Sequence, residues 1–251
     1  MIRYYFITVY CWIVFILTSI LMFIIVLITK LLTFLFDPKL RILQWMSCFW
    51  ASLLVWSNPL WKTTFLGRKK IKDNQTYVIL CNHQSYLDIL VLYGLFKNFK
   101  WVSKSDIFKI PIVGWNMTLN NYISVNRNNK RSQVAMLKAC EDHLHRGSSI
   151  MIFPEGTRSK DGEIHTFKEG AFRLALAAKV SVVPIVVDGT LHGFPTKGLL
   201  FDRTCKISVK VLDPIPYESF SNDSSKEIAN KAFKIMSAGL KTLKESYVDA
   251  I

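Results

Sequence analysis

The sequence lacks the spacing of cysteines that a metal site or a disulfide framework requires. Five cysteines are scattered over 251 residues, and no two of them form a C-x-x-C pair. Zinc sites built from thiolates and small disulfide scaffolds both depend on closely spaced cysteines. We therefore expect neither a bound metal nor a disulfide-stabilised fold. The chain also has no internal repeat and no low-complexity segment.

Acidic residues are scarce in this chain. There are 18 Asp and Glu residues against 32 Lys and Arg residues, which gives a formal net charge of +14 at pH 7. Such a balance suits a surface that faces anionic lipids or phosphorylated substrates. It would also suit nucleic acid, but the basic residues are dispersed and no recognition motif accompanies them. We therefore expect lipid or phosphorylated partners and no nucleic acid.

Charged residues are absent between Tyr4 and Thr29, a run of 26 residues. As a helix this run would extend about 39 Å, against a hydrocarbon core of about 30 Å. Two arrangements fit that length: a tilted transmembrane span, or a helix that enters one leaflet and returns with a partner helix. A cleaved signal peptide is not expected, because the run is too long and lacks a small-residue exit.

The partner helix is predicted from Leu40 to Trp61, after a break at Asp37-Pro38. This segment holds four tryptophans, which favour the membrane interface: Trp45, Trp50, Trp56 and Trp61. Before the apolar run stands one basic residue, Arg3, whereas seven follow it: Lys30, Lys39, Arg41, Lys62, Arg68, Lys69 and Lys70. The positive-inside rule then puts the rest of the chain on the cytosolic side. We thus predict a membrane anchor over residues 1–62, embedded through residues 4–61.

Residues 63–251 are long enough to form one domain with its own core. Strand-like and helix-like runs alternate, which predicts an α/β domain with a central mixed sheet flanked by helices. The strand-like runs are 77–81, 149–153, 181–187 and 205–212, and the helix-like runs are 88–97, 131–146 and 168–179. A capping box at Ser224-x-x-Glu227 opens a charged amphipathic helix that continues to about Tyr247.

A seven-residue loop, Phe153-Pro154-Glu155-Gly156-Thr157-Arg158-Ser159, follows one of these strand-like runs. Its proline and glycine end the strand, and the turn presents a carboxylate, a hydroxyl and a guanidinium together. The planar fork of Arg158 suits a phosphate, and Gly156 lets backbone amides approach such a ligand. The alternative is a polar surface turn in which Glu155 and Arg158 pair with each other.

A second polar segment follows the strand-like run 77–81 and contains His83 and, five residues later, Asp88. In one regular helix these side chains would point about 140° apart. They can meet only if His83 lies in the turn before the helix and Asp88 in its first turn. Ser85 supports this arrangement, because Ser85-x-x-Asp88 has the form of a capping box with Ser85 as the N-cap. The alternative is that Asp88 only caps the helix and His83 is an ordinary loop residue.

Together the two segments resemble the glycerolipid acyltransferases, the 1-acylglycerol-3-phosphate acyltransferases and their relatives. That family carries a His-x4-Asp block and then a Phe-Pro-Glu-Gly-Thr-Arg-Ser block. The resemblance covers most of the chain after residue 62, with further matches at Lys104, Pro111, Gly114, Arg127, 167–171 and 183–186. One position departs from the pattern: the family often has an acidic residue before the arginine, and this chain has Asn126.

The resemblance implies transfer of a fatty acyl chain from acyl-CoA or acyl carrier protein to the sn-2 hydroxyl of 1-acylglycerol-3-phosphate, giving phosphatidic acid. No metal or bound cofactor is implied. His83 suits the role of general base, because its neutral imidazole is available near pH 7. Asp88 would fix the ring tautomer and stabilise the imidazolium, as the acid does in a Ser-His-Asp triad. No serine is needed, since the hydroxyl of the acceptor itself attacks.

The acceptor phosphate is expected to bind at Glu155, Gly156, Thr157 and Arg158. Because a carboxylate repels phosphate, we expect Glu155 to orient Arg158 or to contact a hydroxyl group. Lys104 and Arg127 are secondary candidates for anion contact, the alternative being solvated basic residues on a basic protein.

Several alternatives remain open from the sequence. Cys81 lies two residues before His83 and could form an acyl intermediate, although a cysteine that ends an apolar run usually behaves as a small buried hydrophobe. The acceptor could be another lysophospholipid. The chain could also be a catalytically silent lipid-binding or scaffolding protein, or a hydrolase in which the same base activates water.

Overall fold

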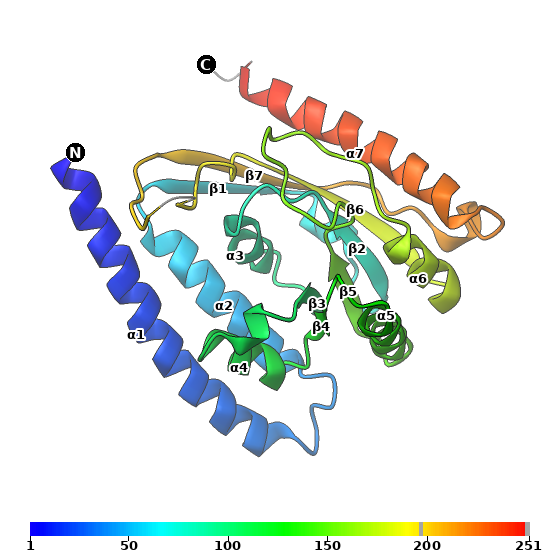
Figure 1. Cartoon of the computed structure of the whole chain (residues 1–251), viewed down its shortest axis with the longest axis horizontal. Helices are drawn as coiled ribbons and strands as arrows, with labels where there is room; N and C mark the ends of the chain where they lie inside the picture. The colour runs from blue at the N-terminus through cyan, green and yellow to red at the C-terminus, as the bar shows by residue number, and fades with distance from the viewer. Residues whose placement is uncertain (196–197, 249–251) are drawn as a thin grey trace.

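The computed structural model describes residues 1–195 and 198–248 and has a central seven-stranded sheet flanked by helices (Figure 1). In sheet order the strands are β1 (Trp61–Leu66), β7 (Cys205–Val211), β6 (Ser181–Asp188), β2 (Tyr77–Cys81), β5 (Ser149–Ile152), β3 (Phe99–Lys104) and β4 (Ile123–Val125). The strands from β6 to β4 are parallel, β7 is antiparallel to β6, and β1 is parallel to β7. The predicted mixed sheet is confirmed.

Helices cover both faces of the sheet. They are α1 (Ile2–Thr33), α2 (Arg41–Ser57), α3 (Leu87–Tyr93), α4 (Val113–Leu119), α5 (Lys130–His145), α6 (Gly170–Ala178) and α7 (Ser225–Val248). Two clusters of buried hydrophobic side chains lie on opposite faces of the sheet. The first cluster includes residues of α2 and α3, and the second includes residues of α5, α6 and α7. Side chains alternate between the faces along a strand. In β2, accordingly, Ile79 belongs to the first cluster and Val78 and Leu80 to the second.

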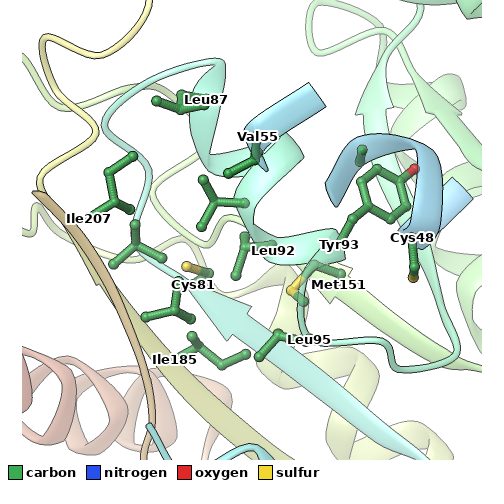
Figure 2. Close-up of a cluster of buried hydrophobic side chains, with 14 of the residues drawn as sticks. Cys48, Val55, Cys81, Leu87, Leu92, Tyr93, Leu95, Met151, Ile185 and Ile207 are labelled. Atoms are coloured by element: carbon green, nitrogen blue, oxygen red, sulfur yellow. The ribbon is translucent and has the colours of Figure 1, made fainter. Parts of the chain in front are cut away.

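The first cluster joins the second helix of the chain to the sheet. Figure 2 shows Val55 of α2 and Leu92 of α3 in the same cluster as Cys81 of β2. The predicted division of the chain after residue 62 remains a prediction, but α2 shares its core with the α/β domain. The predicted extent of this helix is wrong at its end: α2 ends at Ser57, and Trp61 begins β1. Trp61 is buried and donates its indole N–H to the backbone oxygen of Gly193 at 3.0 Å.

The first helix packs along the domain with one face and exposes the other. Near its start, Thr8 accepts a hydrogen bond from the backbone N–H of Phe201 at 3.0 Å, and near its end Lys30 donates to the Leu119 oxygen at 2.7 Å. Its exposed side chains are large and apolar, among them Tyr5, Phe6, Val9, Ile13, Leu17, Leu21 and Ile24. Among the described residues, α1 is the helix long and apolar enough to cross a membrane. This apolar face indicates membrane association.

The C-terminal helix begins as predicted. The Glu227 backbone N–H donates to the Ser224 hydroxyl at 3.3 Å, and the Ser224 backbone N–H donates to the Glu227 carboxylate at 2.7 Å. These two bonds are the reciprocal pair of a capping box.

Candidate functional site

The predicted site residues lie near one edge of the sheet. Strands β2, β5, β3 and β4 are parallel, so their carboxyl ends meet at the same edge. His83 follows β2 by two residues, Phe153 directly follows β5, Lys104 ends β3, and Arg127 follows β4 by two residues. In α/β sheets this edge is the usual place for a ligand.

His83 and Asp88 are in contact. The Nδ1 atom of His83 lies 2.7 Å from Oδ2 of Asp88, and the Asp88 carboxyl group is completely buried. The same Oδ2 accepts hydrogen bonds from the backbone N–H groups of Gln84 at 2.7 Å and Ser85 at 2.9 Å, while Oδ1 accepts one from the Thr190 hydroxyl. A carboxylate surrounded by donors makes Nδ1 the protonated nitrogen of the neutral ring. The lone pair is then on Nε2, where a base needs it.

The turn between β2 and α3 brings the two side chains together. Asn82 fixes the start of this turn, since its side-chain amide donates to the Val187 oxygen at 2.9 Å and its side-chain oxygen accepts from the Val187 N–H at 2.8 Å. The predicted N-cap is wrong by one residue: α3 begins at Leu87, with Tyr86 in the cap position. Ser85 still accepts from the Leu87 N–H, at 3.3 Å, and donates its own N–H to Asp88.

An aromatic stack fixes the plane of the histidine ring. The rings of His83 and Phe153 are nearly parallel, with centroids 3.9 Å apart, and Phe153 in turn stacks on Trp101 at 5.5 Å. The side chain of His83 is 12% exposed, so the ring reaches the surface only at its rim. The stack and the carboxylate together hold one ring orientation.

Glu155 is buried and binds two backbone amides. One carboxylate oxygen accepts from the His83 N–H and the other from the His165 N–H, each at 3.0 Å. Burial raises the pKa of Glu155, and these two amide donors partly oppose that rise. Within residues 1–195 and 198–248 no ion pair joins Glu155 to Arg158, so the structure shows no contact through which Glu155 would orient Arg158, and the alternative, a contact with a hydroxyl group, stays a prediction. Its carboxylate instead ties the predicted phosphate loop to the backbone of the proposed base.

Of the basic residues predicted to contact an anion, Arg158 and Arg127 lie at the loop, whereas Lys104 pairs with an aspartate. The guanidinium of Arg158 lies 4.0 Å over the ring of Tyr86, and Thr157 beside it is exposed. Arg127 reaches the same loop and donates to the backbone oxygen of Gly156. Lys104 instead forms an ion pair with Asp106, which lowers the pKa of that aspartate. The structure therefore brings Arg127 to the predicted phosphate loop, whereas Lys104 pairs with Asp106.

Cys81 is unsuited to carry an acyl group. Its side chain is completely buried in the first hydrophobic cluster, beneath α3 (Figure 2). Burial raises the pKa of this thiol well above its usual value, and the negative charges of Asp88 and Glu155 raise it further. Because the nucleophile would be the thiolate, this environment opposes the acyl-cysteine alternative.

In the part of the chain that the structure describes, no cluster of three or more His, Cys, Asp or Glu side chains is arranged to hold a metal ion. Three residues of the site lay outside the sequence prediction: Asn82, Thr190 and His165, the last through its backbone. The contacts of Asn82 with Val187 and of Thr190 with Asp88 span 105 and 102 residues, for which a single sequence gives no local signal, whereas His165 lies ten residues from Glu155.

The fold and the site define a class: an α/β protein with a histidine–carboxylate pair beside a basic loop, at the carboxyl edge of the sheet. The Acyltransferase family model matches residues 62–188 of this chain. The chain belongs to the acyltransferase family.

Curated relatives agree with that assignment. The chain is 42% identical over 163 residues to a chloroplastic 1-acyl-sn-glycerol-3-phosphate acyltransferase of Arabidopsis thaliana, covering 64% of this chain and 45% of that relative. It is 35% identical over 173 residues to a 1-acyl-sn-glycerol-3-phosphate acyltransferase of Saccharomyces cerevisiae, covering 67% of this chain and 56% of that relative. The chain thus spans about half the length of these relatives.

The solved structure is that of the 1-acyl-sn-glycerophosphate acyltransferase of Thermotoga maritima. It matches with a TM-score of 0.83 at 24% identity, over 97% of both chains. At this level of identity the likeness shows that the two chains share the fold.

Proposed function

We propose that this chain is an O-acyltransferase that moves a fatty acyl chain from an acyl thioester to the sn-2 hydroxyl of 1-acylglycerol-3-phosphate, giving phosphatidic acid. The observation that carries the proposal is the 2.7 Å contact of His83 Nδ1 with the buried Asp88 carboxylate, beside a loop that Arg127 contacts and that carries Arg158. The names of the relatives from Arabidopsis thaliana and Saccharomyces cerevisiae support the choice of acceptor.

In the proposed reaction, Nε2 of His83 takes the proton of the acceptor hydroxyl as its oxygen attacks the thioester carbonyl. The C–O bond forms, the tetrahedral intermediate collapses, and the C–S bond breaks. The departing thiolate takes the proton back from the imidazolium, so that the imidazole is regenerated. Asp88 stabilises the imidazolium between these steps, and its other hydrogen bonds keep it in place.

The acceptor phosphate is proposed to bind at the Glu155–Arg158 loop. The Cζ atom of Arg158 lies 4.0 Å from the centre of the Tyr86 ring, and the N–H donors of its guanidinium would bind the phosphate. Gly156 and Thr157 would supply backbone and hydroxyl contacts. Glu155 acts by holding the loop against the backbone of His83 rather than by touching the phosphate.

The membrane is proposed to be the source of the acceptor. The exposed apolar face of α1 would lie in the bilayer, and the excess of basic residues after it would keep the α/β domain on the cytosolic side. The donor is acyl-CoA or acyl carrier protein, both of which are acidic and suit a chain with a net charge of +14.

The test uses the purified full chain in lipid vesicles, with acyl-CoA or acyl carrier protein as donor. The acceptors are 1-acylglycerol-3-phosphate, its phosphate-free analogue and lysophospholipids with larger head groups. We expect phosphatidic acid as the main product. Free fatty acid alone would indicate a hydrolase, and vesicle binding without turnover would indicate a silent lipid-binding protein; either result contradicts the proposal.

A further inference from the structure

An additional basic residue, Lys168, lies at the phosphate loop. It belongs to the segment between that loop and α6, and two backbone hydrogen bonds fix the segment against the loop. The Lys168 N–H donates to the Pro154 oxygen at 2.9 Å, and the His165 N–H donates to the Glu155 carboxylate at 3.0 Å. The position of Lys168 is therefore set by the loop itself.

The side chain of Lys168 lies over Gly156. A methyl group at Gly156 would lie only 2.9 Å from both Cε and Nζ of Lys168. Gly156 also has a φ of +71°, in the left-handed region that favours glycine. Arg127 meets the same residue, because its guanidinium donates to the Gly156 oxygen. Two cations from separate segments thus converge on one glycine.

In the part of the chain that the structure describes, neither Glu155 nor Glu169 forms an ion pair with Arg127, Arg158 or Lys168. Glu155 is buried and binds the amides of His83 and His165. Glu169, next to Lys168 in the chain, pairs with Arg173 at 2.9 Å and accepts from the Ser225 hydroxyl at 2.7 Å.

Across the described ranges, none of the three exposed cations of the loop region forms an ion pair: Arg127, Arg158 and Lys168. Arg127 and Lys168 contact this glycine turn and Arg158 belongs to it, and three cations without ion-pair partners suit an anion of high charge.

We propose that Lys168 is a specificity-determining residue that binds the acceptor phosphate together with Arg127 and Arg158. The proposal rests on the proposed function and narrows it. A phosphate monoester carries a charge between about −1.5 and −2 near pH 7, whereas a diester carries only one negative charge. Three cations therefore favour a monoester acceptor over a lysophospholipid with an esterified phosphate or an acceptor without phosphate.

The test compares wild type with Lys168→Ala and Lys168→Arg, and uses Lys234→Ala, an exposed lysine on α7, as the matched control. For 1-acylglycerol-3-phosphate we expect Lys168→Ala to raise KM by about tenfold or more while kcat stays within about threefold, since the lost contact is made equally in the ground state and the transition state. Lys168→Arg should recover most of the affinity. Lys234→Ala should match wild type.

Two further readouts separate phosphate binding from a structural role. Turnover of the phosphate-free acceptor should be the same in Lys168→Ala and wild type. Inorganic phosphate should inhibit wild type competitively against the acceptor, and more weakly inhibit Lys168→Ala. Equal KM values and equal phosphate inhibition in the two proteins would overturn the proposal, as would equal losses of kcat with both acceptors together with a lower melting temperature.

The failure of this proposal is distinct from the failure of the proposed function. If wild type acylates 1-acylglycerol-3-phosphate and Lys168→Ala does so with the same KM, the enzyme assignment stands and the role of Lys168 is wrong. If wild type does not acylate this acceptor at all, the proposed function is wrong, and the role of Lys168 falls with it.

Discussion

Asp88 is the side chain on which the proposed chemistry most depends. A buried charge is costly unless hydrogen bonds compensate for the lost hydration. Asp88 has four such donors: Nδ1 of His83, the backbone N–H groups of Gln84 and Ser85, and the Thr190 hydroxyl. The arrangement gives both carboxylate oxygens hydrogen-bond partners and fixes the ring of His83 with Nδ1 toward Asp88.

Replacing Asp88 by asparagine should abolish most of the activity while the side chain keeps its shape. An amide cannot accept all of these bonds, and its NH2 group would favour the histidine tautomer with the proton on Nε2, which cannot act as a base. We expect kcat to fall by about 10²- to 10⁴-fold, as for the acid of a Ser-His-Asp triad. The measurement is the initial rate of phosphatidic acid formation.

The matched control is Thr190→Val, which removes only the donor to Oδ1 and leaves the histidine contact intact. Its kcat should fall by less than about tenfold, the size expected for one hydrogen bond. A melting curve of each variant checks that the fold is retained. A rate for Asp88→Asn close to that of wild type would contradict the assigned role of the carboxylate.

Strand β2 shows what the sequence could predict at the level of elements. Its five apolar residues are bounded by polar ones, and the observed bounds, Tyr77–Cys81, are those predicted.

Three strands, β1, β3 and β4, and one α-helix, α4, were not predicted from the sequence. Strand β3 contains Lys100, whose side chain is buried and donates to the Asn120 oxygen at 3.0 Å, a tertiary contact that hides the strand pattern. Strand β4 has three residues and α4 seven, too few for a clear period, and β1 carries polar residues on its exposed side.

The contacts of the candidate site also include some that were predictable from the sequence and some that were not. The contact of His83 with Asp88 was predictable because five residues separate them and helix capping constrains the turn. The partners of Glu155 were not predictable, because its carboxylate binds the His83 amide 72 residues away. The contact of Thr190 with Asp88 spans 102 residues and leaves no local pattern either.

The exposed apolar face of α1 predicts how substitutions there change membrane binding. Leu17 and Leu21 are exposed on the face proposed to lie in the bilayer, and each charged residue in the middle of a membrane-embedded helix costs about 2.5–3.5 kcal/mol. The double substitution Leu17→Asp and Leu21→Asp should therefore lower the fraction of protein that floats with vesicles by about tenfold or more. The pair Leu17→Ala and Leu21→Ala is the control and should float nearly as wild type does. Unchanged flotation of the aspartate variant would show that this face is not in the membrane.

On the scale of the whole molecule, the segment between β6 and β7 connects the site with the first helix. At one end of it Thr190 bonds to Asp88, and near the other end the Phe201 N–H bonds to Thr8 of α1, while the Leu199 oxygen accepts from Trp12. The described residues on either side of 196–197 thus contact the histidine–aspartate pair on one side and the helix with the exposed apolar face on the other. This connection suits an enzyme whose acceptor comes from a membrane.

The most direct test of the account is the rate of acyl transfer to 1-acylglycerol-3-phosphate by His83→Ala in vesicles. The imidazole is the proposed base, so its removal should lower kcat by roughly 10²- to 10⁴-fold. Vesicle binding and the melting temperature should stay close to those of wild type, because the backbone N–H of residue 83 still binds Glu155 and Asp88 keeps its three other hydrogen-bond donors. A His83→Ala protein that forms phosphatidic acid at a rate close to that of wild type would contradict the account.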